Sequence, residues 1–341
     1  MKRRSLLALP AAALAAPALH AQPTRQNLRF AVDWVIQVNH SWAVLAARRG
    51  YFQEEGINAT VERGFGSGQT IQQIAAGALP LGFADIPTAI QLAIRNPQAG
   101  LRVVGVIYDG SPLVLTVDAN GPIRAPRDVE GRRLAAPEAD AGRQMFPAWA
   151  RATGVDPARV EWVNVTGQLR EAMLARGEVQ GITGFITSTI MGLEVIGMPA
   201  ARQRHFRYRE AGLPFFSGGL VTTQRFAAEN PALLRGAVRA LLRGAQHMAR
   251  DPADAIAAVR EQEPLTDPAV ERRRWEVVRD EMLVTENVRQ NGLSFVDPAR
   301  LQRNIDIVRD TFGLTQPFGP ADIWDGSFLP PRAELALPTT T

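Results

Sequence analysis

The feature that most constrains this chain is a regular alternation of short apolar runs with amphipathic helical patterns. In the first third of the chain, strand-like runs lie at 28–32, 58–62, 81–84 and 101–108, and helical patterns lie at 41–49, 69–76 and 86–94. Strand–helix units repeated in this way are typical of a parallel sheet that is covered by helices on both faces. The sequence therefore predicts an α/β fold.

The same pattern then restarts, which indicates a second lobe. Strand-like runs follow at 133–136, 160–165 and 181–186, with helical patterns at 142–153 and 168–176, and the chain is mostly helical after Pro231. The apolar runs 113–117 and 220–223 are placed to carry the chain out of the first lobe and back. We expect two Rossmann-like lobes joined by a two-crossing hinge, with lobe 1 formed by 27–115 plus 220–341 and lobe 2 by 116–219.

The N-terminus has the pattern of an export signal. Lys2, Arg3 and Arg4 precede an apolar run at 6–19, which is shorter than the roughly 20 residues needed to span a bilayer. We predict a signal peptide at 1–21 and a periplasmic protein. Arg3-Arg4 also resembles a twin-arginine signal, so both export routes stay open.

Composition excludes several classes of chemistry. The chain has no cysteine, Lys2 is its single lysine, and its four histidines lack metal-ligand spacing. Without residues 1–21, the chain has 35 basic residues against 34 acidic ones, which gives no footprint for nucleic acid. We therefore expect no metal, no cofactor and no nucleic-acid partner.

Several motifs together resemble a known family. They are Gly50-Tyr51-Phe52-Gln53-Glu54-Glu55-Gly56-Ile57, the glycine-rich segment 64–70, Gly82-Phe83-Ala84-Asp85, and the segment 126–134. The sequence resembles the type II periplasmic solute-binding proteins of ABC transporters, in the family that covers thiamine-pyrimidine-precursor, alkanesulfonate, taurine and nitrate binding proteins. The resemblance implies a monomer that captures a small solute between its lobes and delivers it to an ABC permease in the inner membrane.

Two other functions share these motifs. A ligand-binding sensor or accessory protein would have the same sequence features. A pyrimidine-synthase-like enzyme has the same broad fold, but its chemistry depends on a lysine-bound cofactor and a histidine-rich site, and this chain has neither once Lys2 is removed. We therefore expect a binding protein and not an enzyme.

Ligands of open α/β sheets bind at the carboxyl ends of the strands, which selects the candidate site residues. In lobe 1 they are Trp34, Asn39, His40, Phe65, Gly66, Ser67, Gly68, Thr70, Asp85, Tyr108 and Asp109. In lobe 2 and at the second crossing they are Asp140, Arg143, Phe185, Thr187 and Phe216.

These residue types leave the ligand class open. Trp34 offers a flat wall for a planar ring, and the strand-end aspartates accept hydrogen bonds from an amino-substituted heterocycle. In contrast, the helix that begins in 66–70 and the guanidinium of Arg143 suit a sulfonate or a carboxylate. Each of these residues also fits an ordinary cap, turn or core position.

Overall fold

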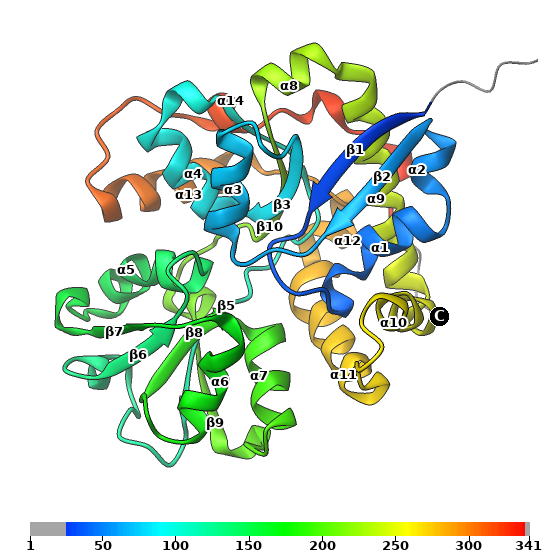
Figure 1. Ribbon diagram of the computed structural model, residues 1–341. Coiled ribbons are helices and arrows are strands. Elements are labelled where there is room, and N and C mark those ends of the chain that lie inside the picture. Colours follow the sequence, from blue (N-terminus) through cyan, green and yellow to red (C-terminus); the bar gives the residue numbers. More distant parts are fainter. Residues whose placement is uncertain (1–24, 338–341) are drawn as a thin grey trace, which may run out of the picture.

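The computed structural model describes residues 25–337, so the predicted signal peptide lies outside the described residues. The chain forms two five-stranded sheets, one in each lobe (Figure 1). Sheet 1 has the order β2-β1-β3-β10-β4, made of β1 (Gln26–Ala31), β2 (Ile57–Glu62), β3 (Leu81–Asp85), β4 (Leu101–Val106) and β10 (Gly218–Thr223). Sheet 2 has the order β7-β6-β8-β5-β9, made of β5 (Leu113–Asp118), β6 (Arg133–Ala136), β7 (Glu161–Asn164), β8 (Gly181–Phe185) and β9 (Gln203–Arg207).

Helices cover both faces of each sheet, as an α/β fold requires. In lobe 1 the helices are α1 (Ser41–Arg48), α2 (Tyr51–Glu54) and α9 (Pro231–Arg250) on one face, and α3 (Ser67–Ala75), α4 (Ile86–Arg95) and α13 (Pro298–Phe312) on the other. Smaller helices complete this lobe: α8 (Gln224–Glu229), α10 (Pro252–Gln262), α11 (Pro268–Val278), α12 (Glu286–Asn291) and α14 (Pro320–Ile323). In lobe 2, α5 (Ala141–Thr153) packs on one face of the sheet, and α6 (Gly167–Ala175) and α7 (Ile186–Val195) pack on the other.

Both sheets are mixed, which corrects the prediction of parallel sheets. Strand β10 runs antiparallel between β3 and β4, and β5 runs antiparallel to both β8 and β9. The chain changes sheets within 107–112 and 208–217, a few residues before the predicted crossings near 115 and 220. An apolar run shows that a strand is buried on both faces, but it does not show the strand's direction or its neighbours.

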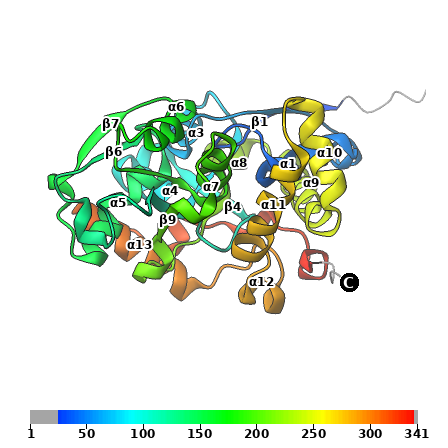
Figure 2. The same cartoon turned by 90° about the horizontal axis from the view of Figure 1, so that it is seen from below.

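The two lobes are in contact on both sides of the space between their sheets. Helix α11 of lobe 1 packs against α7 of lobe 2, and the two lie side by side in the view from below (Figure 2). At this contact Arg273 pairs with Glu194 at 2.7 Å, and Arg274 donates to the Thr187 carbonyl. On the other side α4 and α13 pack against α5. The structure therefore has its lobes closed on each other.

Within residues 25–337, no helix combines the length and the apolarity needed to cross a membrane.

Candidate functional site

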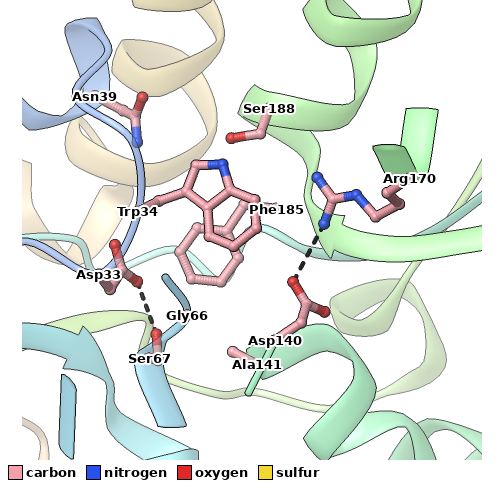
Figure 3. A pocket seen from close by; sticks show the side chains of 10 residues that line it. All are labelled: Asp33, Trp34, Asn39, Gly66, Ser67, Asp140, Ala141, Arg170, Phe185 and Ser188. Carbon is pink, nitrogen blue, oxygen red and sulfur yellow. Dashed lines mark hydrogen bonds and ion pairs between the residues drawn. The ribbon is translucent and has the colours of Figure 1, made fainter. Parts of the chain in front are cut away.

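The carboxyl ends of strands from both sheets face each other and enclose a small cavity, here called the inner recess. Its volume is about 310 Å³ including its open mouth. Polar groups from both lobes converge on it, with the indole of Trp34 between them (Figure 3). The lining residues are Asp33, Trp34, Asn39, Gly66, Ser67, Asp140, Ala141, Arg170, Phe185 and Ser188.

On the lobe 1 wall, the Asp33 carboxylate is held from two sides. Ser67 at the start of α3 donates its hydroxyl to Asp33 Oδ2 at 2.7 Å, and His40 Nε2 lies 3.1 Å from Asp33 Oδ1. The Ser67 hydroxyl oxygen in turn accepts from the backbone N–H of Asp85 at 3.1 Å. These bonds fix the position of Asp33 at the end of β1 before any ligand enters.

Asp85 supports this wall from behind. Its carboxylate caps α4 by accepting from the Thr88 N–H at 3.1 Å and from the Thr88 hydroxyl at 2.8 Å. Burial raises the pKa of Asp85 to about 7, although the bonds from Thr88 act in the opposite direction. Asp85 does not line the recess, so its role is to position Ser67 and α4.

Asn39 lines the recess and carries a side-chain acceptor that is unpaired among residues 25–337. Its side chain is buried, and its Nδ2 lies 3.2 Å from His40 Nε2. Its carbonyl oxygen Oδ1 has no hydrogen-bond partner within the described part of the chain. Buried polar atoms are almost always paired, so this oxygen is a candidate ligand contact.

On the lobe 2 wall, the Arg170 guanidinium is fully buried among acceptors. It donates to the Thr183 carbonyl at 2.7 Å, to Glu171 Oε1 at 2.6 Å and to Asp140 Oδ2 at 3.2 Å. Burial opposes the charged form, but the Glu171 and Asp140 carboxylates outweigh it and raise the pKa of Arg170. Arg170 is therefore charged in the recess.

Asp140 binds three groups of its own lobe. It accepts from the Arg143 N–H at 2.9 Å, which caps α5, and from the Thr183 hydroxyl at 3.1 Å, in addition to Arg170. Burial nevertheless raises the pKa of Asp140, since it outweighs the attraction of the Arg170 charge. A ligand that donates a hydrogen bond here would stabilise the carboxylate.

Trp34 reaches from lobe 1 across to lobe 2. Its ring lies so close to Gly167 that a Cβ added to this glycine would come within 2.3 Å of Trp34 Cη2 and Cζ2. The Arg170 guanidinium lies 5.3 Å from the ring centroid, in a cation–π contact. Trp34 thus closes the recess on the side of lobe 2.

Beyond Trp34 lies a larger cavity, here called the outer chamber. Its volume is about 1210 Å³ including its open mouth, and it shares Trp34 and Ser188 with the inner recess. Its walls come from lobe 1 and from lobe 2, at Val35, Gln37, 63–65, Gln69, 137–139, 164–167, Glu171 and Gly192. The chamber is therefore also formed between the two lobes.

The structure places many of the predicted residues at these cavities. Those that line the inner recess are Trp34, Asn39, Gly66, Ser67, Asp140 and Phe185. Phe65 lines the outer chamber and is 57% exposed. Gly68 lines a third cavity, and its N–H is bound to the Ala139 carbonyl of lobe 2 at 3.1 Å. His40 and Asp85 stand behind the lobe 1 wall, and Thr70 is buried within α3.

Three predicted residues are placed in the core or the hinge of lobe 1, away from both cavities. The Tyr108 ring is buried against Phe83, and Asp109 pairs with Arg300 at 2.6 Å. Phe216 is buried with the Arg300 guanidinium 3.9 Å from its ring centroid. All three residues lie close to the crossings, where a strand end leads into the other lobe and not into the cleft.

Two predicted residues of lobe 2 are also placed differently. Arg143 donates to the Ala136 carbonyl at 2.9 Å and lies 5.0 Å from the Trp162 ring centroid, so it stabilises its own lobe. Thr187 is buried, with its carbonyl bound by Arg274. Neither side chain lines either of the two cavities.

Arg170 is the main residue that the sequence prediction missed. It lies inside the helical pattern at 168–176, which the sequence presents as an ordinary amphipathic helix. A signal for it was available, because the helix begins just after a strand whose carboxyl end faces the cleft. A buried arginine in the first turn of such a helix is a candidate ligand contact.

One group of possible metal ligands lies outside the cleft, at the junction of α9 and α10. The ligand atoms of His247, Asp251 and Asp254 lie within 4.8 Å of one another. However, Asp254 is already paired with Arg48 at 2.7 Å and with Arg49 at 2.6 Å. These guanidinium groups occupy the carboxylate that a cation would need, so the cluster does not favour a metal site.

Three curated relatives match the chain in sequence. The riboflavin-binding protein RibY of Chloroflexus aurantiacus is 24% identical over 335 residues, covering 94% of this chain and 91% of the relative. A formylaminopyrimidine-binding protein of Halalkalibacterium halodurans is 23% identical and covers 68% of this chain and 69% of its own length. A 4-amino-5-hydroxymethyl-2-methylpyrimidine phosphate synthase of Legionella pneumophila is 21% identical and covers 68% of this chain and 72% of its own length.

Solved structures confirm the predicted fold. The alkanesulfonate-binding protein SsuA from Xanthomonas axonopodis pv. citri, bound to MOPS, matches with a TM-score of 0.68 over 91% of this chain and 99% of that chain. Its sequence identity of 17% means that this likeness establishes the fold alone. The fold is that of the periplasmic binding proteins, with two α/β lobes and two crossings.

The sequence also matches a family profile, that of the NMT1/THI5-like proteins, over residues 37–255. The matched region contains most of lobe 1's first half, all of lobe 2 and the long helix α9. This chain belongs to the NMT1/THI5-like family.

Proposed function

We propose that this protein is the periplasmic solute-binding component of an ABC importer, and that its solute is a planar nitrogen heterocycle rich in hydrogen-bond donors. The observation that carries the proposal is the set of acceptors at the inner recess. Asp33 and Asn39 line it from lobe 1, and Asp140 lines it from lobe 2. Asn39 Oδ1 has no partner within the described residues. A donor-bearing solute would bond to both lobes at once and so favour the closed form.

The charge balance supports a neutral or cationic solute. The carboxylates of Asp33 and Asp140 line the recess and Glu171 adjoins it, whereas Arg170 is the single guanidinium among its lining residues. An anion would add negative charge to a site where buried carboxylates already outnumber cations, which costs free energy. This balance disfavours nitrate and sulfonates.

The helix N-termini at the site also disfavour an anion. Asp85 caps α4 and Asp140 caps α5 with their own side chains, and the Gly68 N–H at the start of α3 is bound by the Ala139 carbonyl. At these three helix starts, N–H groups that could hold a carboxylate or a sulfonate are therefore already bound within the protein.

The indole of Trp34 and the names of two relatives support a flat ring. Trp34 borders both cavities, where an aromatic side chain gives a rigid wall for stacking. The relatives named for riboflavin and for formylaminopyrimidine bind nitrogen heterocycles by those names. Delivery to a permease in the inner membrane would follow when the lobes separate by a hinge motion, with the protein acting as a monomer after export through its N-terminal signal.

Calorimetry on the mature chain tests the proposal. We expect riboflavin or 4-amino-5-hydroxymethyl-2-methylpyrimidine to bind, and to raise the free energy of unfolding by about 2.7 kcal/mol at a concentration 100 times Kd. The variant Asp140→Asn should weaken binding at least ~10-fold through the lost charge–donor contact. Its matched control is Asp310→Asn on α13, outside both cavities. Tight binding of nitrate or octanesulfonate, with no heterocycle bound, would overturn the assignment.

An enzyme is the second candidate, favoured by the relative that is named a phosphate synthase. A cofactor bound through lysine would have to use Lys2, the single lysine of the chain. Incubating the mature chain with pyridoxal phosphate and following the absorbance of an internal aldimine separates the two. No aldimine band is expected.

A further inference from the structure

We infer that the solute extends beyond a single ring, with a donor-bearing head in the inner recess and a larger, apolar body in the outer chamber. The inference rests on the proposed function and adds the size and shape of the solute to it. It is carried by the pairing of two cavities of different size and chemistry that share Trp34 in their walls.

The inner recess is small for a complete solute. Its volume of about 310 Å³ counts the open mouth, and the Trp34 indole limits it on one side. Its enclosed part measures only about 20 Å³, little more than the space that one water molecule needs. It suits one polar ring edge better than a molecule of several rings.

The outer chamber is larger and differs in chemistry. Six of the side chains that line it are apolar, namely Trp34, Val35, Phe65, Pro137, Ala139 and Val165. The Phe65 ring is 57% exposed at this position, with the Arg63 guanidinium 5.0 Å from its centroid. An apolar body in the chamber would cover this ring, and burying such exposed apolar surface favours binding.

The position of the chamber ties it to lobe closure. Residues 63–65 of lobe 1 and 164–167 of lobe 2 face each other across it. A body held there would therefore contact both lobes, as the head does in the recess. A solute with one ring would leave the chamber filled with water and would gain nothing from these contacts.

A matched pair of probes tests the inference. The compounds 2,4-diaminopyrimidine and 2,4-diaminoquinazoline carry the same donors, but the second has an additional fused ring. We expect the wild-type mature chain to bind the quinazoline at least ~10-fold more tightly in calorimetry, since the additional ring buries apolar surface in the chamber.

The variant Thr166→Trp then places a large side chain in the chamber. Thr166 is exposed and precedes α6 without forming a side-chain capping bond, so its replacement removes no such bond. The control Thr315→Trp changes an exposed threonine outside both cavities. If Thr166→Trp does not fold, Glu138→Trp fills the chamber from the neighbouring loop, because Glu138 is also exposed.

We expect the filling variant to abolish the advantage of the quinazoline while the pyrimidine keeps its affinity, and Thr315→Trp to leave both affinities unchanged. Equal affinities of the two probes for the wild type, or an equal loss of both in the filling variant, would overturn the two-part solute and leave the proposed function in place. Binding of neither probe would overturn the donor-rich heterocycle itself, and this inference with it.

Discussion

The contact between Trp34 and Gly167 allows lobe closure to be tested by adding a single methyl group at position 167. Trp34 belongs to lobe 1 and Gly167 is the first residue of α6 in lobe 2. A Cβ at position 167 would lie 2.3 Å from two ring carbons of Trp34, whereas carbon atoms in contact are normally about 3.5–4.0 Å apart. Gly167→Ala therefore forces either the indole or the whole lobe to move by more than ~1 Å.

This substitution should act on the closed form alone. Gly167 is not among the glycines with positive φ, so alanine fits its backbone, and the alanine methyl would meet Trp34 only when the lobes are together. Overpacking of this kind costs about 1–3 kcal/mol. If closure carries the whole cost, Kd for the best heterocycle should rise roughly 5- to 150-fold. The free energy of unfolding of the unliganded chain should stay within ~0.5 kcal/mol of wild type, as for a mutation outside the packed core.

A double-mutant cycle in calorimetry identifies the cause. In the Trp34→Ala background the clash is absent, so adding Gly167→Ala should change Kd less than ~2-fold beyond the effect of Trp34→Ala alone. X-ray scattering should show that ligand no longer compacts Gly167→Ala as it compacts the wild type. The reasoning is refuted if Gly167→Ala binds like wild type, or if its loss of affinity persists without Trp34.

Three further predictions concern buried or ion-paired residues of the two lobes. Burial raises the pKa of Asp85 to about 7, so between pH 4 and pH 7, roughly, the folded protein keeps a proton that the unfolded chain releases. The free energy of unfolding should therefore fall by up to roughly 4 kcal/mol as the pH rises through this range. Asp85→Asn should remove this dependence in urea titrations. Arg170→Met should lower the free energy of unfolding by about 3–5 kcal/mol because it leaves buried carboxylates unpaired. The control Arg176→Met, at an exposed ion pair, should leave stability nearly unchanged. Glu194→Arg should raise Kd several-fold by repelling Arg273 across the lobes, and the charge-swapped double variant should restore binding.

The fold was predictable to the extent that each element carries its own pattern. The strand at 133–136 and the helix near 142–153 coincide with β6 and α5, because an apolar run followed by a 3.6-residue period is a local signal. The insertion of β10 between β3 and β4 was not predictable in this way. Strand direction depends on which sheet the returning chain joins, and that is set by contacts far apart in sequence.

The site was predictable in part for the same reason. The strand-end rule found Trp34, Ser67 and Asp140, which line the recess. The rule also selected Asp109, whose strand ends at the hinge and whose carboxylate is held by Arg300. It passed over Arg170, because this residue reaches the recess from a helix whose pattern is that of any amphipathic segment. Whether the end of a strand faces the cleft or the hinge can be decided only when the arrangement of both lobes is known.

The way in which the recess is built explains how a small solute can control a motion of whole lobes. Asp33 is held by Ser67 of its own lobe, and Asp140 by Thr183 of its own lobe, so neither wall depends on the other for its geometry. When the lobes separate, both walls keep their acceptors in place. A solute can therefore bond to one wall in the open form, but it can bond to both walls at once only in the closed form. This difference in contacts is what shifts the equilibrium toward closure.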